Sequence, residues 1–152
     1  MIITVDSNVL LSIFTKDTLY SRASELMEKY SSHEFIINDC IYFELGVNFP
    51  DIETLDVSLD ILEVSVLKAR ALNYASVLDA WTQYLRKKRF LCPSCKETII
   101  LVCPRCTHTL SFRQRILTDF IIGGFAMENS DGIMTLDYSY YRNYFPQLRV
   151  LD

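Results

Sequence analysis

Short runs of apolar, β-branched residues alternate along this chain with longer segments of helical spacing. Four runs suit buried strands: residues 2–5, 34–37, 132–136 and 148–151. Helical spacing covers residues 9–14, 18–30, 38–47, 51–89 (with 64–66 as the place where a break would fall), 119–128 and 138–144. This alternation predicts an α/β fold, with a parallel sheet of about five strands and helices on both faces.

The length of 152 residues suits a single domain with a real core, spanning residues 1–152. The first residues lack a basic segment and place an acid at Asp6, so we expect no signal peptide. No apolar run reaches the roughly 20 residues that a membrane helix needs. We therefore expect a cytoplasmic protein without a membrane partner.

Basic residues are concentrated in one part of an otherwise acidic chain. Between Arg86 and Arg115 there are eight Lys or Arg residues and one acid, whereas the rest of the chain has seven basic and 18 acidic residues. Such a strip is typical of a surface that binds nucleic-acid phosphates. The candidate RNA-binding residues are Arg86, Lys87, Lys88, Arg89, Arg113 and Arg115. A solvated helix end followed by a basic loop explains the same pattern equally well.

Four acidic residues lie where a parallel sheet would gather them. Asp6 follows the first strand, Asp137 follows the strand at 132–136, Asp119 begins a helix, and Glu44 lies in the helix after the second strand. Ligands of open α/β sheets bind beyond the carboxyl ends of the strands. Each acid also has an ordinary structural explanation, as a turn residue, a helix cap or a solvated helix position.

Carboxylates held close together repel one another unless a cation neutralises them. Oxygen ligands of this kind suit Mg²⁺ or Mn²⁺, which activate water for phosphodiester hydrolysis. The two histidines, His33 and His108, have no obvious base partner. The pattern therefore favours metal-assisted hydrolysis over histidine catalysis.

Three segments resemble PIN domains, and in particular the VapC-like toxin ribonucleases of type II toxin–antitoxin systems. They are Asp6-Ser7-Asn8, the stretch from Asp119 to Ala126, and Thr135-Leu136-Asp137 with the Tyr140–Pro146 segment that follows. The resemblance implies metal binding by Asp6, Glu44, Asp119 and Asp137, with Asn8 and Thr135 as supporting hydrogen-bonding groups. Asp39 lies near Glu44, which is preferred because Glu44-Leu45-Gly46 fits the family pattern. The resemblance also implies an RNA substrate, a homodimer and an antitoxin partner.

Two C-P-x-C turns, Cys92 to Cys95 and Cys103 to Cys106, lie seven residues apart within an insertion at 91–111. Two such turns would give a four-cysteine structural zinc site formed by Cys92, Cys95, Cys103 and Cys106. The main alternative is a redox motif, and disulfides are disfavoured in the cytoplasm. His108 is a minor alternative ligand, and Cys40 is most simply a buried helix residue.

These patterns predict a metal-dependent endoribonuclease of the toxin type with an inserted zinc knuckle. An RNA-processing nuclease for ribosomal or transfer RNA maturation is the alternative within the same class. A non-catalytic, zinc-dependent module that binds RNA or protein is the alternative from another class.

Overall fold

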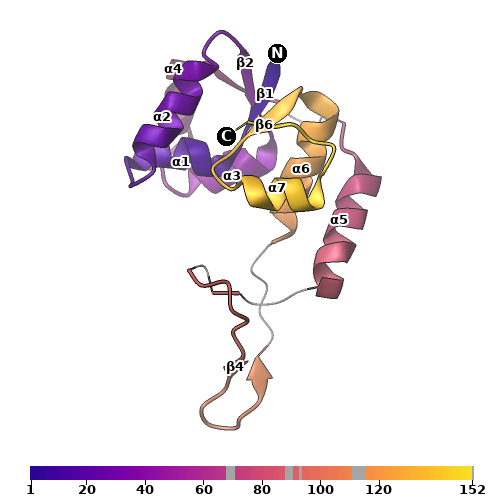
Figure 1. Cartoon of the computed structure of the whole chain (residues 1–152). Coiled ribbons are helices and arrows are strands. Elements are labelled where there is room, and N and C mark those ends of the chain that lie inside the picture. Colours follow the sequence, from indigo (N-terminus) through magenta and orange to yellow (C-terminus); the bar gives the residue numbers. More distant parts are fainter. Residues whose placement is uncertain (68–70, 88–90, 93, 111–115, 152) are drawn as a thin grey trace.

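Five parallel strands form the sheet of the computed structural model, which describes residues 1–67, 71–87, 91–92, 94–110 and 116–151 (Figure 1). The strand order is β3-β2-β1-β6-β7, so β1 lies at the centre between β2 and β6. The bounds are β1 Ile2–Val5, β2 Glu34–Ile37, β3 Val64–Val66, β6 Gly132–Met134 and β7 Val150–Leu151. The predicted α/β fold with a parallel five-stranded sheet is confirmed.

Helices cover the sheet on two sides. Figure 1 shows α2 and α4 on one side of the strands and α5, α6 and α7 on the other. In chain order the helices are α1 Ser7–Thr15, α2 Tyr20–Lys29, α3 Asp39–Gly46, α4 Ile52–Ile61, α5 Tyr74–Lys87, α6 Leu117–Asn129 and α7 Tyr138–Tyr144. Side chains cap the N-termini of two helices. Asn38 accepts a hydrogen bond from the Ile41 N–H at 3.0 Å, and Asp51 accepts one from the Thr54 N–H at 2.7 Å.

The helical segment predicted for residues 51–89 is broken at residues 64–66, the place that the sequence indicated, and the break is a strand followed by a further non-helical stretch. Helix α4 ends at Ile61, the edge strand β3 follows, and α5 begins only at Tyr74. Val64 is buried and pairs with Phe35 of β2, so tertiary contact decides the local structure. A strand of three residues is too short to show an alternating pattern in the sequence.

Aromatic rings fill the space between α5, α6 and α7. Phe120 on α6 lies at the centre, with ring centroids 5.0–5.6 Å from those of Trp81, Tyr84, Tyr140 and Tyr144. Gly123, one turn further along α6, has no space for a side chain, because a Cβ there would lie 2.4 Å from the Phe145 ring. This packing holds α7, and with it the chain after β6, firmly against α6.

An arm, residues 91–110, connects the end of α5 to the segment before α6. It contains two hairpins: one is closed by a bridge between Leu91 and Thr98, and the other by β4 Leu101–Val102 pairing with β5 Thr109–Leu110. Figure 1 shows this arm extending away from the sheet, beyond the ends of α5 and α6. Among the side chains that the structure describes in the arm, none is buried.

Within the described ranges, none of the helices has both the length and the apolar character needed to cross a membrane.

Candidate active site

The carboxyl ends of β1 and β6 lie side by side, because Val5 pairs with Met134 in parallel register. Asp6 continues this pairing, since its N–H donates to the Met134 carbonyl at 2.9 Å. A pocket of about 390 Å³ opens at this point and is lined by Asp6, Ser7, Asn8, Leu19, Asp119, Leu136, Asp137, Tyr140 and Tyr141. Its volume falls within the range of small-ligand sites. Three of the four predicted acids therefore line one pocket.

A hydrogen-bond network around Thr135 joins the two strand ends. The Thr135 hydroxyl donates to Asp6 Oδ2 at 2.7 Å and accepts from the Asp137 N–H at 3.0 Å. Asn8 Nδ2 donates to the same Asp6 oxygen at 2.7 Å and to the Thr135 hydroxyl at 3.1 Å, and Asn8 Oδ1 accepts from the Leu136 N–H at 3.0 Å. The side chains of Asn8 and Thr135 thus orient Asp6 and the chain that carries Asp137.

The fourth acid, Glu44, reaches the site through Ser7. Ser7 lies next to Asp6 in the chain, and its hydroxyl donates to Glu44 Oε2 at 2.6 Å. Asp39, the alternative to Glu44, lines a different pocket, formed with Cys40, Leu67 and Ile121 among others. The charge of Glu44 acts on Asp6, whereas Asp39 does not feature among the groups that shift the Asp6 pKa. The geometry therefore favours Glu44 over Asp39 as a member of the group.

The environment of Asp6 shifts its pKa strongly. Burial raises its pKa from an ordinary value of 3.8 to about 6, although the Thr135 hydrogen bond opposes the shift. The nearby charges of Asp119 and Glu44 raise the pKa further. Asp119 lies in the first turn of α6, where its Oδ2 accepts from the Ile116 N–H at 3.3 Å. The carboxylates of Asp119 on α6 and Glu44 on α3 thus both act on Asp6, which follows β1.

Tyr141 is a member of the pocket that the sequence motifs did not assign. Its side chain is only 2% exposed, and its hydroxyl hydrogen-bonds to Asp6. Burial, followed by the charge of Asp6, raises the Tyr141 pKa well above its ordinary value, so the phenol keeps its proton and acts as the donor. Tyr141 lies on α7, which begins directly after Asp137, and both residues line the pocket.

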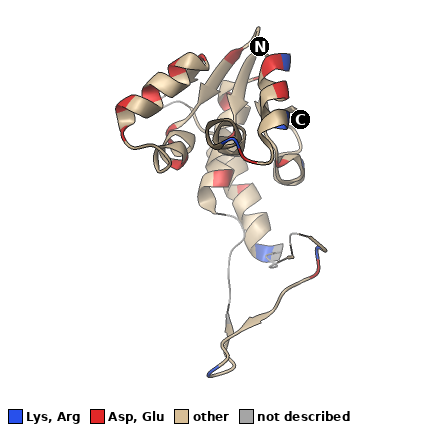
Figure 2. Ribbon diagram, turned by 90° about the vertical axis from the view of Figure 1, so that its left-hand side faces the viewer, with Lys and Arg blue, Asp and Glu red and all other residues tan. Residues whose placement is uncertain are grey.

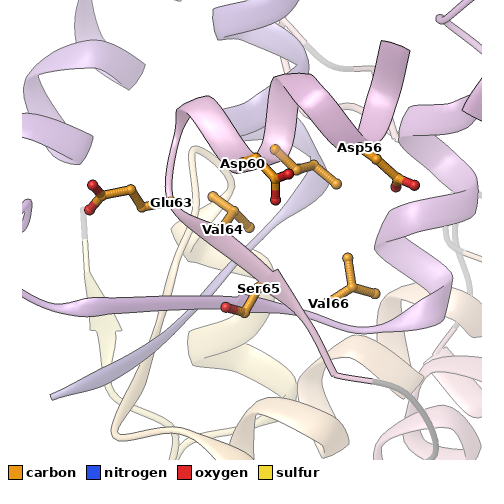
Figure 3. Close-up of a pocket in the computed structure, with 7 residues that line it drawn as sticks. Asp56, Asp60, Glu63, Val64, Ser65 and Val66 are labelled. Carbon is orange, nitrogen blue, oxygen red and sulfur yellow. The ribbon is translucent and has the colours of Figure 1, made fainter. Parts of the chain in front are cut away.

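A second acidic pocket, of about 580 Å³, lies beside the edge strand β3. Figure 3 shows Asp56, Asp60 and Glu63 around it, together with residues of β3. These acids come from α4 and the turn that follows it, and none of the predicted site residues is among them. This pocket provides surface acids that can serve as controls for the site at β1 and β6.

The described part of the chain contains no group of three His, Cys, Asp or Glu side chains arranged closely enough to hold a metal ion. The donor set of the pocket nevertheless suits a hard divalent cation, because a buried carboxylate with two acidic neighbours gains most from a positive charge. Burial raises the pKa of Asp6 most, and the charges of Asp119 and Glu44 add to the shift. The residues present therefore fit Mg²⁺ or Mn²⁺ by their chemistry.

Two solved structures have a similar fold over almost the whole length of both chains. The similarity to a chain of VapBC2 from Rickettsia felis, solved bound to a DNA fragment from the promoter, has a TM-score of 0.56 at 17% identity and covers 99% of this chain and 97% of that one. The similarity to a chain of VapBC-1 from nontypeable Haemophilus influenzae has a TM-score of 0.58 at 16% identity and covers 100% and 98%. The chain has a PIN-like fold. No protein-family profile and no curated protein sequence matches it.

The arm of this PIN-like chain does not assemble the predicted four-cysteine site. Each C-P-x-C turn lies in its own hairpin, and Figure 1 shows the β4–β5 turn at the far end of the arm. Backbone N–H groups of Cys95 and Ser94 hydrogen-bond to the Cys92 sulfur and lower the pKa of Cys92. Those of Cys106 and Arg105 do the same for Cys103. Cys40, the fifth cysteine, lies on α3 and is partly buried.

The predicted RNA-binding strip falls largely outside the described residues. Lys88, Arg89, Arg113 and Arg115 lie there, whereas Arg86 is exposed in the last turn of α5 and Lys87 ends that helix. Figure 2 shows basic residues at this end of α5 and on the arm, while acidic residues are spread over the helices of the PIN-like body. The basic strip itself stays a prediction.

Proposed function

We propose that this chain is a metal-dependent ribonuclease of the VapC type, which hydrolyses RNA phosphodiesters in the pocket between β1, β6 and α6. The observation that carries the proposal is the buried Asp6, whose pKa is raised to about 6 with Asp119 and Glu44 acting on it. A structural acid in a turn or a helix cap has no reason to be buried beside two other acids. In a site that binds a cation and a phosphate, buried acids lie close together because they hold the cation.

Asp6, Glu44, Asp119 and Asp137 would hold Mg²⁺ or Mn²⁺ in this proposal. When bound, such an ion activates a water molecule and stabilises the charge that develops on the phosphate. Asn8 and Thr135 hold Asp6 in place through hydrogen bonds of 2.7 Å to one of its oxygens. Tyr141 donates to the same carboxylate from the opposite element, α7. The chain therefore supplies a rigid acid cluster rather than a histidine base.

The basic strip would bind the RNA backbone beside this cluster. Helix α5 ends, and α6 begins, at the same end of the helix pair, from which the arm extends (Figure 1). Asp119 lies in the first turn of α6, so the base of the arm and the pocket are on the same side of the body. A basic arm next to an acidic pocket would hold phosphates within reach of the metal site.

The same proposal includes a homodimer and an antitoxin partner. Both solved structures named above are of VapBC assemblies, which supports a protein partner for this chain. Large apolar side chains on α3 and α4 are exposed, with Phe43 at 69%, Val47 at 84% and Ile61 at 75%. Exposed apolar surface of this kind is typical of protein interfaces. Sedimentation of the purified chain alone tests whether it forms a homodimer. The cytoplasmic location stays a prediction.

Cleavage of labelled RNA by the purified chain tests the catalytic proposal. We expect cleavage with Mg²⁺ or Mn²⁺, none with EDTA, and a loss of at least about a hundredfold in Asp6→Asn and Asp119→Asn, because removing ligands removes the metal. Asp60→Asn, in the acidic pocket beside β3, is the matched control and should cleave normally. Undiminished cleavage by both active-site variants would overturn the assignment. A folded chain that never cleaves would favour a non-catalytic binding module.

A further inference from the structure

The two cysteine turns of the arm have the same backbone conformation. In the first, the Cys92 N–H donates to the Glu97 carbonyl at 2.8 Å and the Lys96 N–H to the Cys92 carbonyl at 2.9 Å. In the second, the equivalent bonds from Cys103 to His108 and from Thr107 to Cys103 are both 2.9 Å. The two C-P-x-C segments thus share the same pair of backbone hydrogen bonds.

Each turn contains a residue in the left-handed region at the same place, four positions after its first cysteine. Lys96 has a φ of 64° and Thr107 a φ of 58°. This region is unfavourable for residues other than glycine, and especially for a β-branched residue such as threonine. In each turn, two backbone N–H groups hydrogen-bond to the sulfur of the first cysteine. A sulfur that accepts two N–H groups is prepared to carry negative charge.

The arm has no core that would fix its hairpins by burial. Ile100 is 73% exposed and Val102 is 52% exposed, and no described side chain of the arm is buried. A segment of this size needs another cross-link to offset the entropy of ordering it. Structural metals supply that cross-link in small domains.

We propose that the two turns together bind one zinc ion through Cys92, Cys95, Cys103 and Cys106, and that this binding folds the two hairpins of the arm against each other. Four thiolates in tetrahedral arrangement are a site for zinc. Only seven residues separate Cys95 from Cys103, so these two cysteines remain within about 29 Å of each other even when that link is fully extended. Once a zinc ion is bound by the two thiolates of one turn, the thiolates of the other turn are therefore at a high effective concentration around it.

This site is independent of the proposed nuclease activity, because none of its ligands lines the pocket at β1 and β6. Failure of one proposal therefore leaves the other untouched. The measurements below use the full chain and do not depend on RNA cleavage.

Elemental analysis of the untagged chain, purified with reductant and without added metal, is the first measurement. We expect about one zinc per chain in the wild type and in Cys40→Ser, the control at the partly buried cysteine of α3. Cys92→Ser and Cys103→Ser each remove one ligand from a different hairpin. Both should lose most of the zinc, because a single turn offers only two thiolates.

Thiol titration and limited proteolysis complete the test. In the zinc-loaded chain the four arm thiols should react with a disulfide reagent at least about tenfold more slowly than after zinc removal, and the arm should resist protease in parallel. Circular dichroism of the serine variants shows that the body remains folded. An absence of zinc, iron in its place, zinc retained by either serine variant, or four freely reacting arm thiols would overturn the proposal.

Discussion

In the body of this chain, side chains such as Ile36 and Leu10 are completely enclosed, whereas in the arm Ile100 exposes 73% of its surface. The body is held by apolar burial between the sheet and its helices, and the arm by backbone hydrogen bonds within two turns. Burial favours one packed arrangement of many elements, while local turns leave the relative placement of the hairpins open. One chain thus contains a part whose arrangement a packed core defines and an arm that, within its described residues, has no such core.

The pH dependence of stability gives the largest effect expected in the body. Because the pKa of Asp6 is about 6 in the folded chain and 3.8 ordinarily, the folded chain binds the extra proton between these values. In metal-free buffer the free energy of unfolding should therefore fall as pH rises from about 4 to about 6, by up to about 3 kcal/mol. Asp6→Asn should abolish most of that fall, as measured by urea unfolding across pH. An equal fall in the variant would contradict the burial of a charged Asp6.

Overpacking at Gly123 comes next. Gly123→Ala places a Cβ against the enclosed Phe145 ring, so we expect a loss of about 2–3 kcal/mol in the free energy of unfolding. Gly46→Ala is the matched control, since its Cβ would lie 3.8 Å from Leu55, an ordinary contact. Urea unfolding of both variants measures the difference. Equal stability of the two would show that α7 is not packed against α6 as described.

Much of the secondary structure of the body could be predicted, because short stretches of the sequence indicate it. The apolar runs at β1 and β2 have the predicted bounds, as does α7, and the rule that ligands bind at strand ends placed Asp6 and Asp137 together. Strand β3 was missed because only its pairing with β2 makes it a strand. Helix α6 begins at Leu117, two residues before the predicted Asp119, because caps shift helix starts by a residue or two.

The site was less predictable than the fold. Asn8 and Thr135 followed from the family resemblance, but Tyr141 depends on how α7 turns one phenol toward Asp6, which no motif encodes. The cysteine turns were visible in the sequence as two C-P-x-C motifs, and the structure adds their common conformation. Their placement relative to each other could not be predicted, because no buried contact of the described arm fixes it.

Substitutions in the basic strip test whether the residues beside the arm bind RNA. Replacing Lys87, Lys88 and Arg89 by alanine should weaken RNA binding about tenfold at low salt and flatten its salt dependence by about 0.7 for each phosphate that the variant no longer binds. Cleavage at saturating RNA should change little, because the pocket residues are untouched. Filter binding at several salt concentrations measures both quantities. Normal RNA binding together with failure to bind a protein partner would instead identify the strip as a docking surface.

Tyr141→Phe is expected to have the smallest effect. Loss of one hydrogen bond to Asp6 should lower cleavage several-fold and the free energy of unfolding by about 1 kcal/mol. Tyr138→Phe on the same helix is the control, because its ring contact with Arg142 does not need the hydroxyl. The metal concentration for half-maximal cleavage should change in the first variant only. Identical metal dependence in both variants would remove Tyr141 from the site.

Direct measurement of Mn²⁺ binding tests the central claim, that the carboxylates at the ends of β1 and β6 form a metal site. Isothermal titration at pH 7.5 should show one or two Mn²⁺ ions per wild-type chain. At pH 5.5 the same binding should also release a proton, because Asp6, with a pKa of about 6, is then mostly protonated. Asp60→Asn should bind equally well, and Asp6→Asn at least about tenfold more weakly. If Asp6→Asn binds Mn²⁺ as the wild type does, the metal is held elsewhere and the account of this site is wrong.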